Sequence, residues 1–145
     1  MKYYYIEPEV AGSLGENTVI HREVHPPRVS KLHYRFDGWL GDVLLESFPS
    51  FIVAEDVEKK LHSIGASGTS FDVVEVTMSD QFKELYPNRS LPKFVWLRIT
   101  GRPGRDDFGT APDGRLVASE RVIEVLKELG IPNALVTPFG YDPET

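Results

Sequence analysis

Residues 51–65 have the sequence FIVAEDVEKKLHSIG, and this stretch decides the expected fold. Its first four residues are apolar, which predicts a short buried strand. The residues that follow place Val57, Leu61 and Ile64 on one face at helical spacing, so they predict an amphipathic helix. Two acidic residues at the helix start suit the positive end of the helix dipole, and Gly65 is a typical helix stop. The stretch therefore predicts a strand that leads directly into a helix.

Residues 115–130, RLVASERVIEVLKELG, repeat this pattern. The strand residues Val53 and Val117 are 64 residues apart (117 − 53), whereas the helix residues Leu61 and Leu126 are 65 apart (126 − 61). One inserted residue near the helix start would reconcile the two separations. We expect a single domain over residues 1–145 with an internal duplication, in about residues 44–78 and 115–139. The alternative is that any strand–helix junction produces such a likeness.

The other predicted elements complete an α+β fold with additional N-terminal strands and a mostly antiparallel or mixed sheet. Ser79 is expected to cap a brief helix that ends at Pro87, and Ser119 is a good N-cap for the second long helix. Residues 101–114 are expected to form a polar, Gly-rich loop, the longest connection in the chain. The remaining predicted strands are residues 3–6, 18–25, 29–36, 71–78, 93–99 and 134–139.

The composition predicts a folded protein that stays in the cytoplasm. The chain has 145 residues, of which 41% are hydrophobic, so it can bury a core without disulfides or metals. It has no cysteine, which excludes disulfides, cysteine nucleophiles and cysteine–zinc sites. The first residues turn acidic before an apolar stretch can form, so they do not predict a signal peptide.

The charge balance favours a protein partner over nucleic acid. Sixteen Lys and Arg against 22 Asp and Glu give a net charge of −6. An acidic chain repels phosphate backbones at long range and attracts basic proteins. The same balance is also common in proteins that need it only for solubility.

No catalytic or metal-binding pattern is complete in this sequence. His21 and His25 have a metal-binding spacing only on a helix, and their surroundings favour a strand, where they would lie about 13 Å apart. Asp107-Phe108-Gly109 matches a kinase triplet, but the other kinase motifs are missing. Phosphate-binding loops and the nucleophile elbow of hydrolases are missing as well. We therefore expect no enzymatic activity, no cofactor and no metal.

Tryptophan and nearby acids are the candidate contacts for a partner. Trp39 lies in a Gly-rich turn between acidic residues, and an aromatic residue of this kind often anchors an interface. The alternatives are that Trp39 folds back onto the core and that the acids form a solvated face. The predicted partner-binding residues are Trp39, Asp42, Glu46, Asp106 and Asp107.

Five short motifs carry a resemblance to a known family. They are FPSFIVAE at residues 48–55, ELYP at 84–87, PKFVWL at 92–97, DDFG at 106–109 and RLVASE at 115–120. Over roughly residues 44–139 the chain resembles immunity proteins of bacterial polymorphic toxin systems, of the myxobacterial type.

The resemblance implies a protein that is not an enzyme and that binds and neutralises a cognate toxin domain. It supplies no catalytic residues to carry over. Some proteins of this kind have paired cysteines suited to zinc, and since this chain has none, no metal is carried over. Our leading hypothesis is that the protein occludes the active site or substrate groove of a basic toxin. The alternatives are a small hydrolase that reverses a toxin's modification, and a general interaction module or homodimer.

Overall fold

The computed structural model describes residues 2–140. Short strands dominate these residues, and the helices are few, so the predicted α+β class with mostly antiparallel sheets is confirmed. The elements in chain order are β1 (Tyr3–Glu7), β2 (Gly12–Leu14), β3 (Val19–His21), β4 (Arg28–Lys31), β5 (His33–Phe36), β6 (Leu44–Ser47), β7 (Ser50–Ala54), α1 (Glu55–Ser63), β8 (Thr69–Asp72), β9 (Glu75–Met78), α2 (Asp80–Leu85), β10 (Phe94–Ile99), β11 (Phe108–Thr110), β12 (Leu116–Ser119), α3 (Glu120–Leu129) and β13 (Leu135–Phe139).

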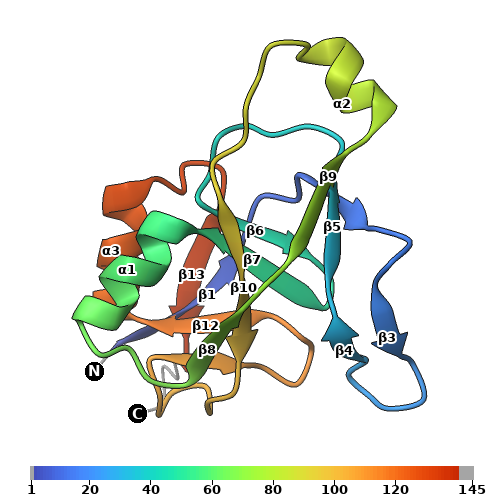
Figure 1. The fold of residues 1–145 in the computed structure, drawn as a ribbon. Coiled ribbons are helices and arrows are strands. Elements are labelled where there is room, and N and C mark those ends of the chain that lie inside the picture. Colours follow the sequence, from blue (N-terminus) through green and yellow to red (C-terminus); the bar gives the residue numbers. More distant parts are fainter. Residues whose placement is uncertain (1, 141–145) are drawn as a thin grey trace.

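Two four-stranded sheets with the same topology form the body of the molecule (Figure 1). Their strand orders are β6-β7-β10-β8 and β11-β12-β1-β13, and neighbouring strands in both are antiparallel. In each sheet a hairpin leads into a helix, and the helix leads to the strand at the far edge. We call β6, β7, α1, β8 and β10 the first unit, and β11, β12, α3, β13 and β1 the second unit.

Both predicted strand–helix–strand segments are thus present as elements, and their origin in a duplication stays a prediction. The units differ in where their third strand comes from. In the first unit this strand is β10, which follows β8 in the chain. In the second unit it is β1, which comes from the N-terminal end and inserts between β12 and β13.

The cross-strand register shows that the two units match without an insertion at the helix start. Leu97 of β10 pairs with residue 51 on one neighbouring strand and with residue 71 on the other, and Ile6 of β1 pairs in the same way with residues 116 and 136. Both pairs of matching residues are 65 apart in the sequence (116 − 51 and 136 − 71). The extra residue lies in the hairpin turn, which spans 110–116 in the second unit and only 46–51 in the first. The prediction of an insertion near the helix was therefore wrong. The matching triplets are Phe51-Leu97-Phe71 and Leu116-Ile6-Val136.

The two long helices begin in the same way. The N–H of Glu55 donates to the carbonyl of Lys93, and the N–H of Glu120 donates to the carbonyl of Lys2, each at 2.9 Å. A carbonyl of the neighbouring strand thus satisfies the first helical N–H group, which has no partner inside the helix. Ser119 stands at the N-cap position of α3, but its side chain makes no capping bond. The predicted role of this serine as a cap was therefore wrong.

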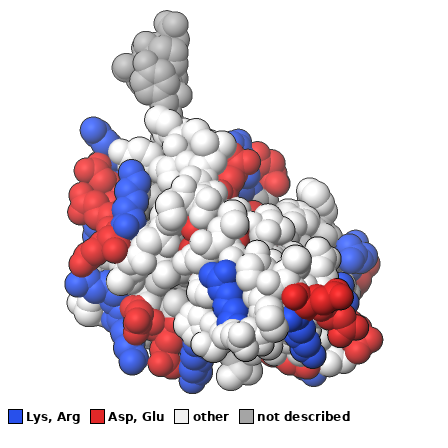
Figure 2. Space-filling view, turned by 90° about the horizontal axis from the view of Figure 1, so that it is seen from above, with Lys and Arg blue, Asp and Glu red and all other residues white. Residues whose placement is uncertain are grey.

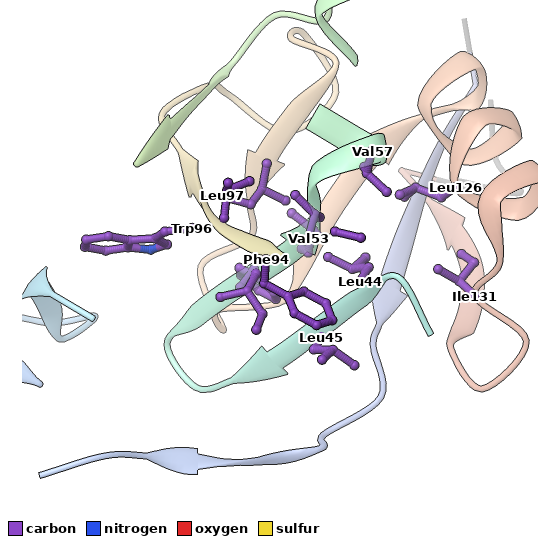
Figure 3. Close-up of a cluster of buried hydrophobic side chains, with 14 of the residues drawn as sticks. Leu44, Leu45, Val53, Val57, Phe94, Trp96, Leu97, Leu126 and Ile131 are labelled. Atoms are coloured by element: carbon purple, nitrogen blue, oxygen red, sulfur yellow. The ribbon is translucent and has the colours of Figure 1, made fainter. Parts of the chain in front are cut away.

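The apolar faces of α1 and α3 pack against each other between the units. Val57 and Leu61 of α1 and Val122 and Leu126 of α3 are all buried, as the helical spacing predicted. Figure 3 shows Val57 and Leu126 facing each other, with Leu44 and Val53 of the first sheet beneath α1. The units therefore share one hydrophobic core.

Two of the predicted strands are each divided into two. Residues 71–78 form the end of β8, a corner at Val73-Val74, and then β9, which leaves the first unit and pairs in parallel with β5. Residues 29–36 are divided at Leu32 into β4 and β5. Strands β2, β5 and β9 make a third sheet, and β3 and β4 form a separate hairpin. Only Val19–His21 of the predicted strand at 18–25 is extended in a sheet.

The predicted polar loop at 101–114 contains a strand. Residues Phe108–Thr110 form β11, which pairs with β12 at the edge of the second sheet. A Cβ atom on Gly109 would lie 2.2 Å from the backbone nitrogen of Pro103, so the preceding turn packs directly on this strand. Within residues 2–140, no helix has the length and apolar character needed to cross a membrane.

Candidate functional site

Trp39 is held in place although part of its ring is exposed. It lies between β5 and β6, and its Nε1–H donates to the backbone carbonyl of Asp42 at 3.0 Å. Its ring meets the buried ring of Phe94 edge to face, with centroids 5.9 Å apart. Both sequence-based interpretations thus apply in part, because the ring packs on the core and still reaches the surface.

Arg89 bridges Trp39 and a second aromatic ring. Its guanidinium carbon lies 4.6 Å from the ring centroid of Trp39 and 5.3 Å from that of Tyr86. Tyr86 directly follows α2, and its ring packs on the fully buried Phe82 at 5.2 Å. Ser79 caps α2 as predicted, since its hydroxyl accepts from the N–H of Phe82 at 3.1 Å. The arginine is therefore placed by two segments that are far apart in the sequence.

Exposed apolar side chains adjoin this aromatic and arginine cluster in the chain. Leu40 next to Trp39 is 68% exposed, and Leu85 next to Tyr86 is 60% exposed. Val10, which is 66% exposed, follows Glu9, whose carboxylate accepts from the N–H of Leu40 at 2.7 Å. We call this region the Trp39 surface. It consists of Val10, Trp39, Leu40, Leu85, Tyr86 and Arg89.

The loop between β5 and β6, which carries Trp39 and Leu40, runs along the side of the molecule from which α2 projects (Figure 1). Figure 2 views the molecule from this side, and charged side chains gather mainly toward the edges of the face. A pattern of this kind, with a less charged centre and a polar rim, is typical of protein–protein interfaces.

Buried Glu9 fixes the loop that carries Trp39. Its carboxylate accepts from the N–H groups of Leu40 and Asp42, at 2.7 and 3.3 Å. Burial raises the pKa of Glu9, and the two N–H donors oppose this rise. The loop is therefore ordered by hydrogen bonds within the protein before any partner binds.

Two of the other predicted contacts, Asp42 and Glu46, lie near Trp39 in the chain. The side chain of Asp42 has no exposed surface, and its oxygens accept from the backbone N–H of Asn133 at 2.9 Å and from the amide of the same residue at 2.7 Å. Glu46 on β6 is partly exposed. Burial, together with the charge of Glu7, raises the pKa of Glu46 to about 7.

The last two predicted contacts lie at the other end of α3. Asp107 is 6% exposed and forms an ion pair with Arg121 at 2.6 Å. It also accepts from the hydroxyl of Ser119 at 2.7 Å and from the N–H of Ser67 at 2.9 Å. Asp106 accepts from a backbone N–H at 2.7 Å, so it orders the turn before β11.

The five predicted residues therefore do not form one surface. Asp42 precedes β6 and is bonded to the loop after α3, whereas Asp107 is bonded next to the start of that helix. The structure uses the carboxylates of Asp42 and Asp107 inside the fold, and Trp39 alone among the five belongs to the aromatic cluster. Sequence reasoning missed Arg89 and Tyr86, although the latter belongs to the ELYP motif.

Three groups with shifted pKa values, Glu9, Tyr34 and Asp107, are hydrogen-bonded within the fold, whereas the raised pKa of Glu46 comes from burial and from the charge of Glu7. Arg121 holds the pKa of Asp107 well below its usual range, chiefly by hydrogen bonding, and burial raises the pKa of Tyr34. The Tyr34 hydroxyl accepts from the N–H of Ala11 at 3.0 Å and donates to the carbonyl of Glu46 at 3.1 Å. Across residues 2–140, no three His, Asp or Glu side chains converge on a point where they could hold a metal ion.

Comparison with known proteins does not place the chain in a family. No model of a known protein family matches the sequence, and no curated protein is recognisably related to it. The resemblance to immunity proteins therefore stays a prediction from the motifs.

Proposed function

We propose that this protein is an immunity-type inhibitor, which binds a toxin domain of another protein through the Trp39 surface and covers its active site or substrate groove. The observation that carries the proposal is the Trp39–Arg89–Tyr86 cluster, with the arginine between two partly exposed rings. Tryptophan, tyrosine and arginine are the residues most enriched among those that dominate binding energy at interfaces.

The rigidity of this cluster supports a binding role. Trp39 is fixed by its hydrogen bond and by Phe94, and Tyr86 is fixed by Phe82. A preformed surface loses little conformational entropy when the partner binds, so more of the contact energy contributes to affinity. The exposed Leu40 and Leu85 add apolar area that is removed from water on binding.

The overall charge supports a basic partner. The net charge of −6 attracts basic proteins at long range, and the active-site clefts of toxins that attack nucleic acids are commonly basic. A stable complex of this kind buries on the order of 1,600 Å² in total. The Trp39 surface supplies the apolar centre of such an interface, and the net negative charge of the chain would speed the encounter with a basic partner.

Co-expression tests the proposal. The toxin candidate is the C-terminal domain of the large protein encoded by the neighbouring gene, produced with this protein and with variants. Wild-type protein should rescue growth and co-purify with the domain. Trp39→Ala and Arg89→Ala should each weaken the complex by about 2 kcal/mol or more, that is, roughly 30-fold. Leu135→Ala is the matched control, because Leu135 is 56% exposed on β13 and lies outside the Trp39 surface.

Other results of the same co-expression experiment would favour an enzyme or a general interaction module instead of an occluding inhibitor. Rescue of growth without a stable complex would contradict occlusion and indicate an enzyme that reverses the toxin's modification. Absence of any toxin gene nearby, together with a stable homodimer that buries Trp39, would indicate a general interaction module. An unchanged affinity of both variants, with a complex still formed, would move the interface away from the Trp39 surface.

A further inference from the structure

A second surface feature is an open groove of about 330 Å³. Four segments that are distant in the sequence line it: residues 26–29 around the start of β4, the β6–β7 turn at 48–51, residues 96–100 of and after β10, and the β11–β12 turn near Gly114. None of its lining residues belongs to the Trp39 surface. The groove therefore needs an explanation of its own.

The apolar wall of the groove is built around Phe48. This side chain is 52% exposed in the turn between β6 and β7. Its ring lies against Gly114, where a Cβ atom would come within 2.7 Å of the ring, and where the φ angle of +90° also favours glycine. Pro26 and Pro27 contribute apolar surface to the groove. An exposed aromatic ring thus packs directly against backbone on one side.

The floor of the groove contains Trp96. In Figure 3 this side chain extends from β10 away from the other labelled core residues. It is 5% exposed, and the guanidinium carbon of Arg98 lies 4.4 Å from its ring centroid. Asp72 on the neighbouring strand β8 pairs with Arg98 at 3.3 Å and helps to keep it over the ring.

The charged residues that line the groove are both basic. Arg28 and Arg98 line it, and its lining includes no Asp or Glu, although the chain as a whole carries a net charge of −6. Arg28 is exposed and makes no ion pair within residues 2–140. Arg28 therefore offers a full positive charge, whereas Arg98 shares its charge with Asp72 and offers its remaining N–H donors. An arginine pair of this kind beside an apolar wall matches a ligand that carries carboxylates next to apolar groups.

We propose that this groove binds an acidic segment of a partner protein, in which carboxylates meet Arg28 and Arg98 and an apolar side chain packs against Phe48. A small anion would remain largely hydrated in so open a groove, whereas a peptide segment also covers the exposed ring and the prolines. The site is independent of the Trp39 surface and does not rest on the proposed function.

Trp96 supplies a direct readout of binding. The chain has two tryptophans, so Trp39→Phe leaves Trp96 as the only one. The probes are three blocked hexapeptides in which Leu alternates with Glu, with Gln or with Lys. The Glu peptide should change the Trp96 emission in a saturable way. The Gln peptide should bind at least tenfold more weakly, and the Lys peptide should not bind, because it faces two arginines.

Variants locate the site within the Trp39→Phe background. Arg28→Gln should weaken binding of the Glu peptide about tenfold, since it removes one charged contact. Phe48→Ala should weaken the Glu and Gln peptides alike. Arg105→Gln is the matched control, because Arg105 is exposed and does not line the groove. Equal unfolding midpoints of the Arg28 and Arg105 variants would exclude misfolding as the cause of a difference.

Several results of these binding experiments would contradict the assignment of the groove to an acidic peptide segment. Equal affinity for the Glu and Gln peptides, or an equal effect of Arg28→Gln and Arg105→Gln, would overturn it. So would the absence of any response up to millimolar peptide. If N-acetylglutamate amide competes as well as the hexapeptide at equal Glu concentration, the groove is a small-anion site and the assignment to a peptide is overturned.

Discussion

At the scale of single residues, two buried aspartates bind the units to each other reciprocally. Asp42 precedes β6 of the first unit and accepts from Asn133 in the loop after α3 of the second. Asp107 precedes β11 of the second unit and accepts from Ser67 in the loop after α1 of the first. Hydrogen bonds to buried carboxylates are stronger than those between neutral groups. Each unit therefore provides one acceptor and one donor loop to the other.

Asp107→Asn should destabilise the protein at neutral pH. The variant cannot form the ion pair with Arg121, and its remaining hydrogen bonds are made by a neutral amide instead of a carboxylate. The expected decrease in the free energy of unfolding is about 1–3 kcal/mol. The pKa of Asp107 lies below its usual range in the folded state, chiefly through Arg121, so the stabilisation is present at neutral pH and is lost on acidification. The loss begins only below the usual pKa of 3.8, so urea unfolding at pH 7, pH 4 and pH 2.5 should give a similar difference between wild type and variant at pH 7 and pH 4 and a smaller one at pH 2.5.

Asp113→Asn is the control for that experiment. Asp113 is also paired with an arginine, Arg115 at 2.8 Å, but it is exposed. Exposed ion pairs contribute little because water screens them. A loss in this variant equal to that of Asp107→Asn would contradict the role assigned to burial.

Glu46→Gln should change the pH dependence in the opposite direction. Burial and the nearby Glu7 raise the pKa of Glu46 to about 7, above its usual value of 4.5. A carboxyl whose pKa is raised on folding favours the folded state at low pH, and this contribution is lost as pH rises through about 7. The variant should therefore gain stability relative to wild type between pH 5 and pH 8, as measured by urea midpoints. Parallel profiles over this range would contradict the prediction.

At the scale of elements, the short edge strand β11 depends on a close approach of backbone to backbone. A Cβ atom on Gly109 would lie 2.2 Å from the nitrogen of Pro103 and 2.5 Å from its Cα. Such contacts cannot be relieved by moving a side chain. The Gly-rich composition of this region therefore reflects tight packing.

Gly109→Ala should destabilise the protein by about 3 kcal/mol, because the turn at Pro103 must move away from β11. Thermal unfolding would measure this loss. Gly38→Ala is the control, since a Cβ atom there meets nothing within 4 Å. A loss of similar size in both variants would show that the close contact is not the cause.

The success of the sequence-based prediction varied with how local the signal was. Strand β7 and helices α1 and α3 were predicted because their apolar spacing is set within one element. The division between β8 and β9 was missed although the alternation of apolar residues changes phase at the corner, where Val73 and Val74 are adjacent. The Trp39 surface was found only in part, since Arg89 reaches Trp39 through the path of α2 and the chain after it. Contacts of this type have no local pattern.

At the scale of the whole molecule, the shared core predicts one cooperative unfolding transition. Leu126 on α3 belongs to the second unit and is fully buried, and Trp96 on β10 belongs to the first. Leu126→Ala in the Trp39→Phe background should lower the free energy of unfolding by about 2–5 kcal/mol. The emission of Trp96 and far-UV circular dichroism should give the same lowered midpoint. A Trp96 midpoint unaffected by this change would mean that the units unfold separately.

The place of β1 in the second sheet has a consequence for biosynthesis. Translation proceeds from the N-terminus, so β1 leaves the ribosome long before its neighbours β12 and β13 are made. All elements of the first unit are available in the nascent chain before β11 is translated. During this time the strand partners of residues 3–5, three tyrosines in β1, have not yet been synthesised. A chain stalled before β11 would therefore expose this tyrosine segment and present a substrate for chaperones or proteases.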